Sequence, residues 1–176
     1  MLGISAILIS TKYEEIYPPE MKDLLGIAEG KYVRADLLRM ETRILHCLEY
    51  DFMFPSPLRF LERYRKISSI LQYDDRIFFF AQYLLEISLL DAALLKFKPS
   101  QLSAAAIILS ARAVKRVTIW NKDMEQWTGY KEEDLKEVVE DVRSFAHEVN
   151  PKFLSTLKYK FGKPENHEVA SIPFKF

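Results

Sequence analysis

Two segments of this chain, residues 2–14 and the centre of residues 100–116 (Ala104–Leu109), carry apolar residues on nearly every side of a helical wheel. A helix of that kind is expected at the centre of a domain, where other helices cover all of its sides. The other apolar residues recur at spacings of three, four and seven, which is typical of amphipathic helices, and no segment alternates with period two. The sequence therefore predicts an all-α fold built around two central helices.

Proline and glycine divide the chain into helices. Pro18 and Pro19 end the first helix, because proline lacks a backbone donor and forces an extended residue before it. Residues 54–57 read Phe-Pro-Ser-Pro, the strongest helix-breaking run in the chain. We therefore expect three parts: a domain at 1–54, a domain at 55–150, and a C-terminal helix and tail at 151–176. The remaining helices are expected at 20–25, 34–48, 58–69, 74–90, 122–127, 131–148 and 153–161.

The two halves of the chain correspond when the sequence is shifted by 98 residues. Ser5 then falls on Ser103, and Asp36 falls on Asp134. Each half contains a buried helix, a short helix, a turn and an amphipathic helix in the same order. In the second half two further helices precede these, which makes a unit of five helices and roughly a hundred residues. The first half has only the last three, so we expect its first two helices to belong before residue 1.

Composition excludes several classes of protein. The 25 basic residues balance 25 acidic ones, so no overall positive charge is available to hold a nucleic acid backbone. Cys47 is the single cysteine, which fits a reducing compartment. No apolar stretch approaches the ~18 residues typical of a membrane span. Residues 26–32 imitate a phosphate-binding loop but lack its spacing and its Ser or Thr after the lysine. We expect no catalytic, metal or cofactor site, and no membrane or nucleic acid partner.

Three segments resemble mitotic cyclins of the A and B types, most closely the B type. Lys12–Glu20 (KYEEIYPPE) looks like the signature of the cyclin box, and Leu38–Glu41 resembles the following helix of that family. Phe54–Tyr64 is similar to the B-type join between two cyclin boxes. The resemblance implies a cyclin-like fold of two five-helix boxes in tandem, with the first box truncated. It also implies that the N-terminal region with its destruction signal, and a Met-Arg-Ala-Ile-Leu-type patch that docks substrates, are absent from this chain.

The same resemblance implies a function. Cyclins of this type are regulatory subunits, not enzymes, that bind and activate a cyclin-dependent protein kinase at the G2/M transition. A protein of this type is expected in the nucleus and the cytoplasm. In the family, a Lys and a Glu at the positions of Lys12 and Glu41 face the kinase. The apolar part of that contact maps onto Tyr13, Leu45, Tyr50 and Phe52.

Other interpretations of these residues stay open at this point. Without the resemblance, Lys12 would complement the negative end of its helix dipole, Glu41 would be a solvated surface residue, and the four apolar residues would be core. A transcription factor of the IIB type has the same fold and binds DNA, and a local basic patch could serve it (Arg112, Lys115, Arg116). A nonfunctional truncated cyclin is the third alternative. Trp120 and Trp127 are expected to pack in the core.

Overall fold

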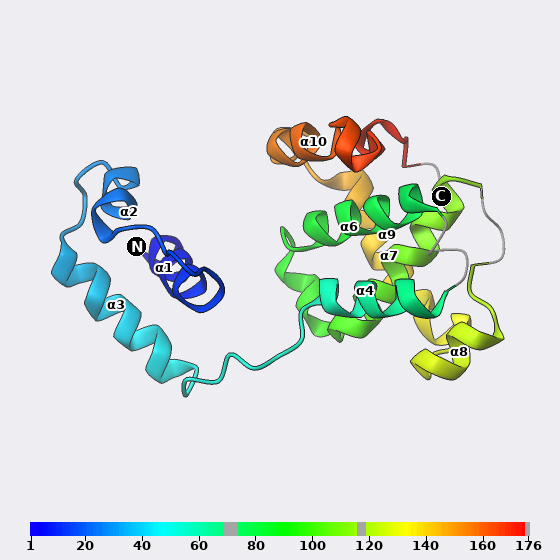
Figure 1. The fold of residues 1–176 in the computed structure, drawn as a ribbon, viewed down its shortest axis with the longest axis horizontal. Coiled ribbons are helices and arrows are strands. Elements are labelled where there is room, and N and C mark those ends of the chain that lie inside the picture. Colours follow the sequence, from blue (N-terminus) through cyan, green and yellow to red (C-terminus); the bar gives the residue numbers. More distant parts are fainter. Residues whose placement is uncertain (69–73, 116–118, 175–176) are drawn as a thin grey trace. The chain divides into compact units, whose positions relative to one another are not determined.

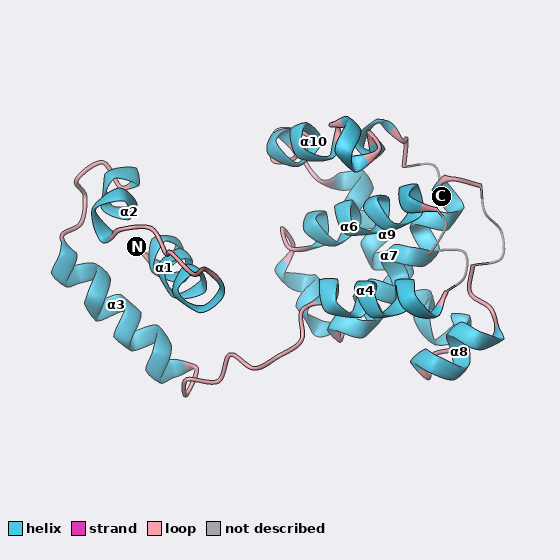
Figure 2. Ribbon diagram, in the orientation of Figure 1, coloured by secondary structure: helices cyan, strands magenta, loops and turns pink. Residues whose placement is uncertain are grey.

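The computed structural model describes residues 1–68, 74–115 and 119–174. Within these ranges the chain forms helices joined by loops and contains no strand, which confirms the predicted all-α class (Figure 2). Across the same ranges, no helix has the length and apolar character that crossing a membrane requires.

The chain divides into two compact units, Met1–Phe54 and Pro55–Phe176 (Figure 1). Pro57 is the first residue of a helix in the second unit, a position where proline is favoured because its missing N–H would have no helical partner. The first unit contains α1 (Leu2–Glu14), α2 (Met21–Ile27) and α3 (Arg34–Cys47). The second unit contains α4 (Pro57–Ile67), α6 (Asp75–Ser88), α7 (Pro99–Ala113), α8 (Lys122–Thr128), α9 (Lys136–Glu148) and α10 (Ser155–Phe161).

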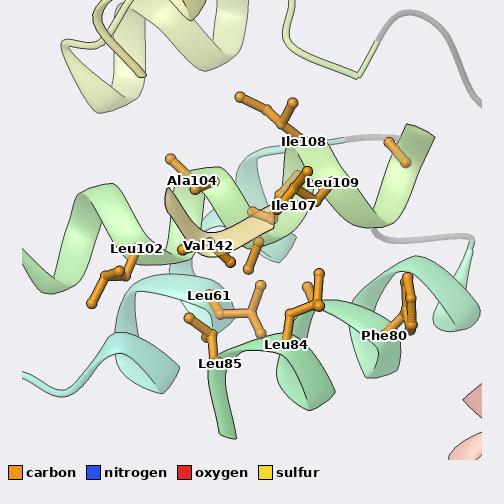
Figure 3. Packing of buried hydrophobic residues seen from close by; sticks show 14 of the residues in the cluster. Leu61, Phe80, Leu84, Leu85, Leu102, Ala104, Ile107, Ile108, Leu109 and Val142 are labelled. Carbon is orange, nitrogen blue, oxygen red and sulfur yellow. The ribbon is translucent and has the colours of Figure 1, made fainter. Parts of the chain in front are cut away.

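Helix α7 is the centre of the second unit. Every residue from Leu102 to Ala111 is buried, and the helix packs against α4, α6 and α9. Figure 3 shows side chains of α4, α6 and α9, among them Leu61, Leu84 and Val142, converging on α7. Alanines supply much of the α7 surface, so neighbouring helices can approach it closely (Ala104, Ala105, Ala106, Ala111). The prediction that residues 100–116 form a buried central helix is confirmed for the part of that segment that α7 covers.

The serines buried in α7 keep their hydrogen bonds. Ser103 donates to the carbonyl oxygens of Pro57, at 2.5 Å, and Pro99, at 2.9 Å. Ser110 donates to the carbonyl of Ala106 at 2.6 Å. A buried hydroxyl without a partner would cost about 1–3 kcal/mol, so these bonds allow polar side chains inside the core. The Ser103–Pro57 bond also ties the start of α7 to the start of α4.

The first unit has a much smaller core. Its buried apolar cluster consists of Leu8, Leu24 and Leu37, one from each helix. Within α1 only Ser5 and Leu8 are buried, while Leu2 and Ile7 are among the exposed large apolar side chains of the molecule. The prediction that 2–14 is a buried central helix is therefore wrong for this structure, because α2 and α3 cover only part of its circumference.

Two further expectations for the second unit need correction. Trp120 is buried and its indole N–H donates to the Tyr130 carbonyl at 3.0 Å, but Trp127 is exposed. Beyond α10, the predicted tail forms 3₁₀ turns, and Val169 within them is fully buried against the core. Phe174 stacks on the ring of Phe80 at a centroid distance of 5.9 Å. The C-terminal segment thus packs on the unit through aromatic contacts that no helical periodicity encodes.

Candidate kinase-binding surface

A charged pair joins the end of α1 to the middle of α3. The Lys12 Nζ atom lies 2.6 Å from Glu41 Oε1, and the two residues are 29 positions apart in the chain. The side chain of Lys12 is 46% exposed, whereas that of Glu41 is only 11% exposed. The interpretation of Glu41 as a solvated surface residue is therefore wrong. The buried carboxylate has an ammonium partner, as a desolvated charge requires.

Local sequence signals bring the pair together. Pro18 and Pro19 follow α1 and allow the chain to turn into the short helix α2, which packs on both α1 and α3. Leu37, fully buried, lies one helical turn before Glu41 on the face of α3 that meets α1. Lys12 also lies in the last turn of α1, where a positive charge complements the helix dipole. Its dipole role and its pairing with Glu41 are thus compatible.

Aromatic residues flank the charged pair. Tyr13 directly follows Lys12, and its ring centroid lies 5.9 Å from that of Phe52, with a tilted arrangement. Tyr13 is 56% exposed, and Phe52 is half-buried. Both rings therefore remain partly open to solvent although they contact each other. The interpretation of Tyr13 as a core residue is wrong for this structure.

Tyr50 is presented by the turn that ends α3. Glu49 and Tyr50 both have positive φ angles, 51° and 59°, and the Tyr50 N–H donates to the carbonyl of Leu45 at 3.0 Å. The Tyr50 ring is 58% exposed and makes a T-shaped contact with the His46 ring, with the two ring centroids 5.6 Å apart. Leu45 lies one turn after Glu41 on α3 and is half-buried. The six residues implied by the resemblance thus all belong to the first unit. Lys12 and Glu41 form a charged pair, Tyr13 and Phe52 contact each other, and Tyr50 contacts His46.

Sequence reasoning missed two exposed residues next to this set. Ile16 and Tyr17 follow Glu15, the residue that caps the end of α1, and are 88% and 89% exposed. Exposure of two large apolar side chains in succession is unusual enough to mark a candidate contact. The signal that could have found them is the Lys12–Glu20 motif itself, which contains both.

The structure gives little support for a DNA-binding patch or a metal site. Arg112, from the basic patch considered for DNA, forms an ion pair with Glu132 at 3.0 Å, which cancels its charge locally. Lys115 belongs to the turn after α7, and Arg116 lies outside the described residues. Among the residues that the structure describes, no group of three or more His, Cys, Asp or Glu side chains could hold a metal ion.

Comparison with known proteins supplies the family. Residues 1–53 match the family model described as "Cyclin, N-terminal domain", and residues 55–175 match "Cyclin, C-terminal domain". The two matches meet at the Phe-Pro-Ser-Pro run that separates the two units. They confirm the predicted cyclin-like fold, with two domains in tandem.

Curated relatives give the same result. A G2/mitotic-specific cyclin-B of Dictyostelium discoideum is 31% identical over 174 residues, which are 98% of this chain and 39% of the relative. The cyclin-B2 of Rana japonica is 35% identical over 150 residues, 85% of this chain and 37% of the relative. The cyclin-B1 of Xenopus laevis is 30% identical over 175 residues, 98% of this chain and 43% of the relative. The chain thus spans about two fifths of the length of these relatives. It belongs to the cyclin family, and mitotic B-type cyclins are the relatives to which it is similar.

Proposed function

We propose that this protein is a regulatory, non-enzymatic subunit that binds and activates a cyclin-dependent protein kinase in G2/M control. The observation that carries the proposal is the Lys12–Glu41 pair, with its Tyr13–Phe52 contact, on a chain whose relatives are named G2/mitotic-specific cyclins. A charged pair beside partly exposed aromatic rings has the composition expected of an interaction hot spot. The proposed site of action is the nucleus and the cytoplasm.

The charged pair is suited to binding a partner because its geometry is already fixed and Lys12 still has unused hydrogen-bond donors. A lysine ammonium has three donors, and only one is needed for Glu41 Oε1. The exposed part of Lys12 can donate its remaining hydrogen bonds to carbonyl groups of a kinase segment. Glu41, held in place by burial and by Lys12, loses little further side-chain entropy on binding. The pair thus supplies orientation and specificity to an otherwise apolar contact.

Activation then follows from differential binding. A kinase helix that carries an ATP-site glutamate has an active and an inactive orientation, and only the active one assembles the kinase Lys–Glu ion pair. A surface that contacts one orientation better shifts the population toward it by the difference in binding free energy. Lys12, Glu41 and the aromatic residues around them are the groups proposed to make this distinction.

The test is a double substitution with a matched control. Lys12→Ala with Glu41→Ala should reduce binding of a purified cyclin-dependent kinase by about 30-fold or more, because truncating a desolvated charged contact costs about 2–5 kcal/mol. The control, Lys22→Ala with Glu20→Ala, removes another ion pair of the first unit, joined at 2.8 Å but with both side chains largely exposed. It should leave binding unchanged.

Circular dichroism on each variant checks that the helices remain. Undiminished kinase binding by the folded Lys12→Ala/Glu41→Ala variant would refute the assignment of this surface. An equal loss in the control variant would show that the effect is general electrostatics and not a specific contact.

A further inference from the structure

An open groove lies between α4 and α8 in the second unit, on elements that take no part in the charged pair. Its described lining consists of Arg63, Lys66 and Ile67 from α4 and Trp127 from α8. The groove has a volume of about 370 Å³, within the range of roughly 300–1,000 Å³ that ligand-binding clefts occupy. Helices α4 and α8 are in direct contact (Figure 1), so the groove is formed within one compact unit.

Trp127 is the unusual member of this lining. It is 60% exposed, whereas Trp120, the other tryptophan of the sequence, is only 9% exposed. The cause is local: α8 is a short helix that buries Met124 and ends at Gly129, which leaves Trp127 on its open flank. A solvent-exposed indole contributes little to folding, but tryptophan is one of the residues enriched in the hot spots of protein–protein interfaces.

The charges of the groove have one sign. Arg63 and Lys66 are both cationic, and no acidic residue lines the groove among the described residues. The other two arginines of this part of α4 have acid partners, since Arg59 pairs with Glu62 and Arg65 pairs with Asp75. Arg63 has no ion pair anywhere in the described ranges, and segments 69–73 and 116–118 contain no Asp or Glu in sequence. The groove therefore presents positive charge on a protein whose formal net charge is zero.

We propose that this groove binds a short acidic segment of a partner protein, with an aromatic or leucine side chain against Trp127 and Ile67 and neighbouring carboxylates paired with Arg63 and Lys66. The apolar part of the lining suits one large side chain, and the cations on the α4 side suit carboxylates adjacent to it in sequence. Carboxylates form bidentate hydrogen bonds with a guanidinium, so Arg63 is the orienting group. This site lies in the second unit, whereas the Lys12–Glu41 pair belongs to the first.

The test uses the full chain and a fluorescein-labelled peptide, Gly-Glu-Asp-Phe-Glu-Asp-Leu-Gly, titrated by fluorescence anisotropy. Saturable binding is expected, and Trp127→Ala should weaken it at least about tenfold, the range of an interface hot spot. Arg63→Ala should weaken it less, about three- to tenfold, and should reduce its dependence on salt. In a Trp120→Phe background, Trp127 is the only tryptophan, so its emission should shift to shorter wavelength as the peptide covers it.

Matched controls separate this site from a general effect. Tyr159 is an exposed aromatic residue, with the Lys163 ammonium 5.2 Å from its ring centroid, elsewhere in the same unit. Tyr159→Ala should leave the affinity for the peptide unchanged. A control peptide in which Ala replaces both Phe and Leu should not bind the unmodified protein.

Four outcomes of the peptide titrations would overturn the proposal. These are no saturable binding to the unmodified chain, full affinity after Trp127→Ala, equal binding of the peptide without Phe and Leu, or an equal effect of Tyr159→Ala. Sedimentation velocity tests a second copy of the chain as the occupant. If the chain forms a dimer that is lost in Trp127→Ala, the groove binds a second copy of the chain and not an acidic partner segment, which would refute the proposal.

Discussion

The surface around α1 and α3 in the first unit has a counterpart around α7 and α9 in the second, 98 residues further along the chain. The counterpart of Lys12 is Ser110, which is fully buried and bonded to its own helix. The counterpart of Glu41 is Val139, which is 6% exposed. One repeat thus places a charged pair where the other places a small hydroxyl and an apolar side chain.

The comparison of the two repeats indicates which residues are needed for folding in both of them. Leu37 and its counterpart Leu135 are both fully buried. Asp36 and Asp134 both accept a hydrogen bond from the backbone N–H three residues earlier, at 3.1 and 2.9 Å. These features recur because they form the start of the amphipathic helix and its contact with the central helix. The charged pair does not recur, so the packing of such a unit does not require it, which accords with the role in kinase binding proposed above.

The shared leucines should show the largest effects. Leu135→Ala removes a fully buried side chain beside α7 and should lower the free energy of unfolding of the second unit by about 2–5 kcal/mol. Urea unfolding followed by tryptophan fluorescence measures this, because both tryptophans lie in the second unit.

The matched control for Leu135→Ala is Leu95→Ala, at a position that is 77% exposed. It should change the free energy of unfolding by less than about 0.5 kcal/mol. Leu37→Ala should destabilise the first unit correspondingly, measured as an early loss of helical circular dichroism. A cost below about 1 kcal/mol at position 135 would contradict the view that this leucine is a shared structural requirement.

The next experiment exchanges the residues that differ between the repeats. Lys12→Ser with Glu41→Val gives the first unit the residues of the second. Removing both partners together leaves neither charge uncompensated, so the unfolding free energy should change by about 1 kcal/mol or less. Kinase binding should fall by about 2–5 kcal/mol, since the charged contact is lost. Calorimetric titration with the kinase and urea unfolding measure the two quantities separately.

The single substitution Lys12→Ser sharpens this exchange. It leaves the buried Glu41 carboxylate without its ammonium, which should cost about 1–3 kcal/mol of stability. If the double exchange binds the kinase as well as the unmodified chain, the charged pair has no role in recognition. If Lys12→Ser has the same free energy of unfolding as Lys12→Ser/Glu41→Val, the buried Glu41 carboxylate does not need the Lys12 ammonium for stability.

Much of this fold could be predicted from the sequence because its signals are local. Pro18, Pro19 and Pro57 break or start helices through their own backbone chemistry, so the helix boundaries in the structure lie within a few residues of those expected. The all-α class followed from apolar spacing along single helices. Such signals need no knowledge of what lies across the fold.

The errors concern contacts between distant segments. Apolar residues all round α1 indicated burial, but burial depends on how many neighbours surround a helix, and among the described elements α1 packs mainly against α2 and α3. Trp127 was expected in the core because tryptophan is apolar, yet the short α8 has only one buried face. The Lys12–Glu41 distance and the burial of Glu41 likewise depend on the path through α2. The spacing of apolar residues in the sequence assigns each residue to a helix, but contacts between residues of different helices depend on the tertiary packing.

The smallest predicted effect concerns the Asp36 carboxyl. The N–H of Val33, and secondarily the Arg39 guanidinium, hold the pKa of the Asp36 carboxyl below its usual value of 3.8. A lowered folded-state pKa means that ionised Asp36 stabilises α3 above pH 3.8, and that this contribution is lost as the pH falls through the folded-state pKa. Asp36→Asn should therefore remove part of the acid-induced loss of helicity. Because the backbone bond is the larger cause, Arg39→Gln should leave the pKa of Asp36 still lowered in an NMR titration. The second repeat has Glu137 at the position that corresponds to Arg39. If the pKa of Asp36 returned to its ordinary value in Arg39→Gln, the arginine would be the main cause of the lowered pKa, and the backbone bond shared by both repeats would not be.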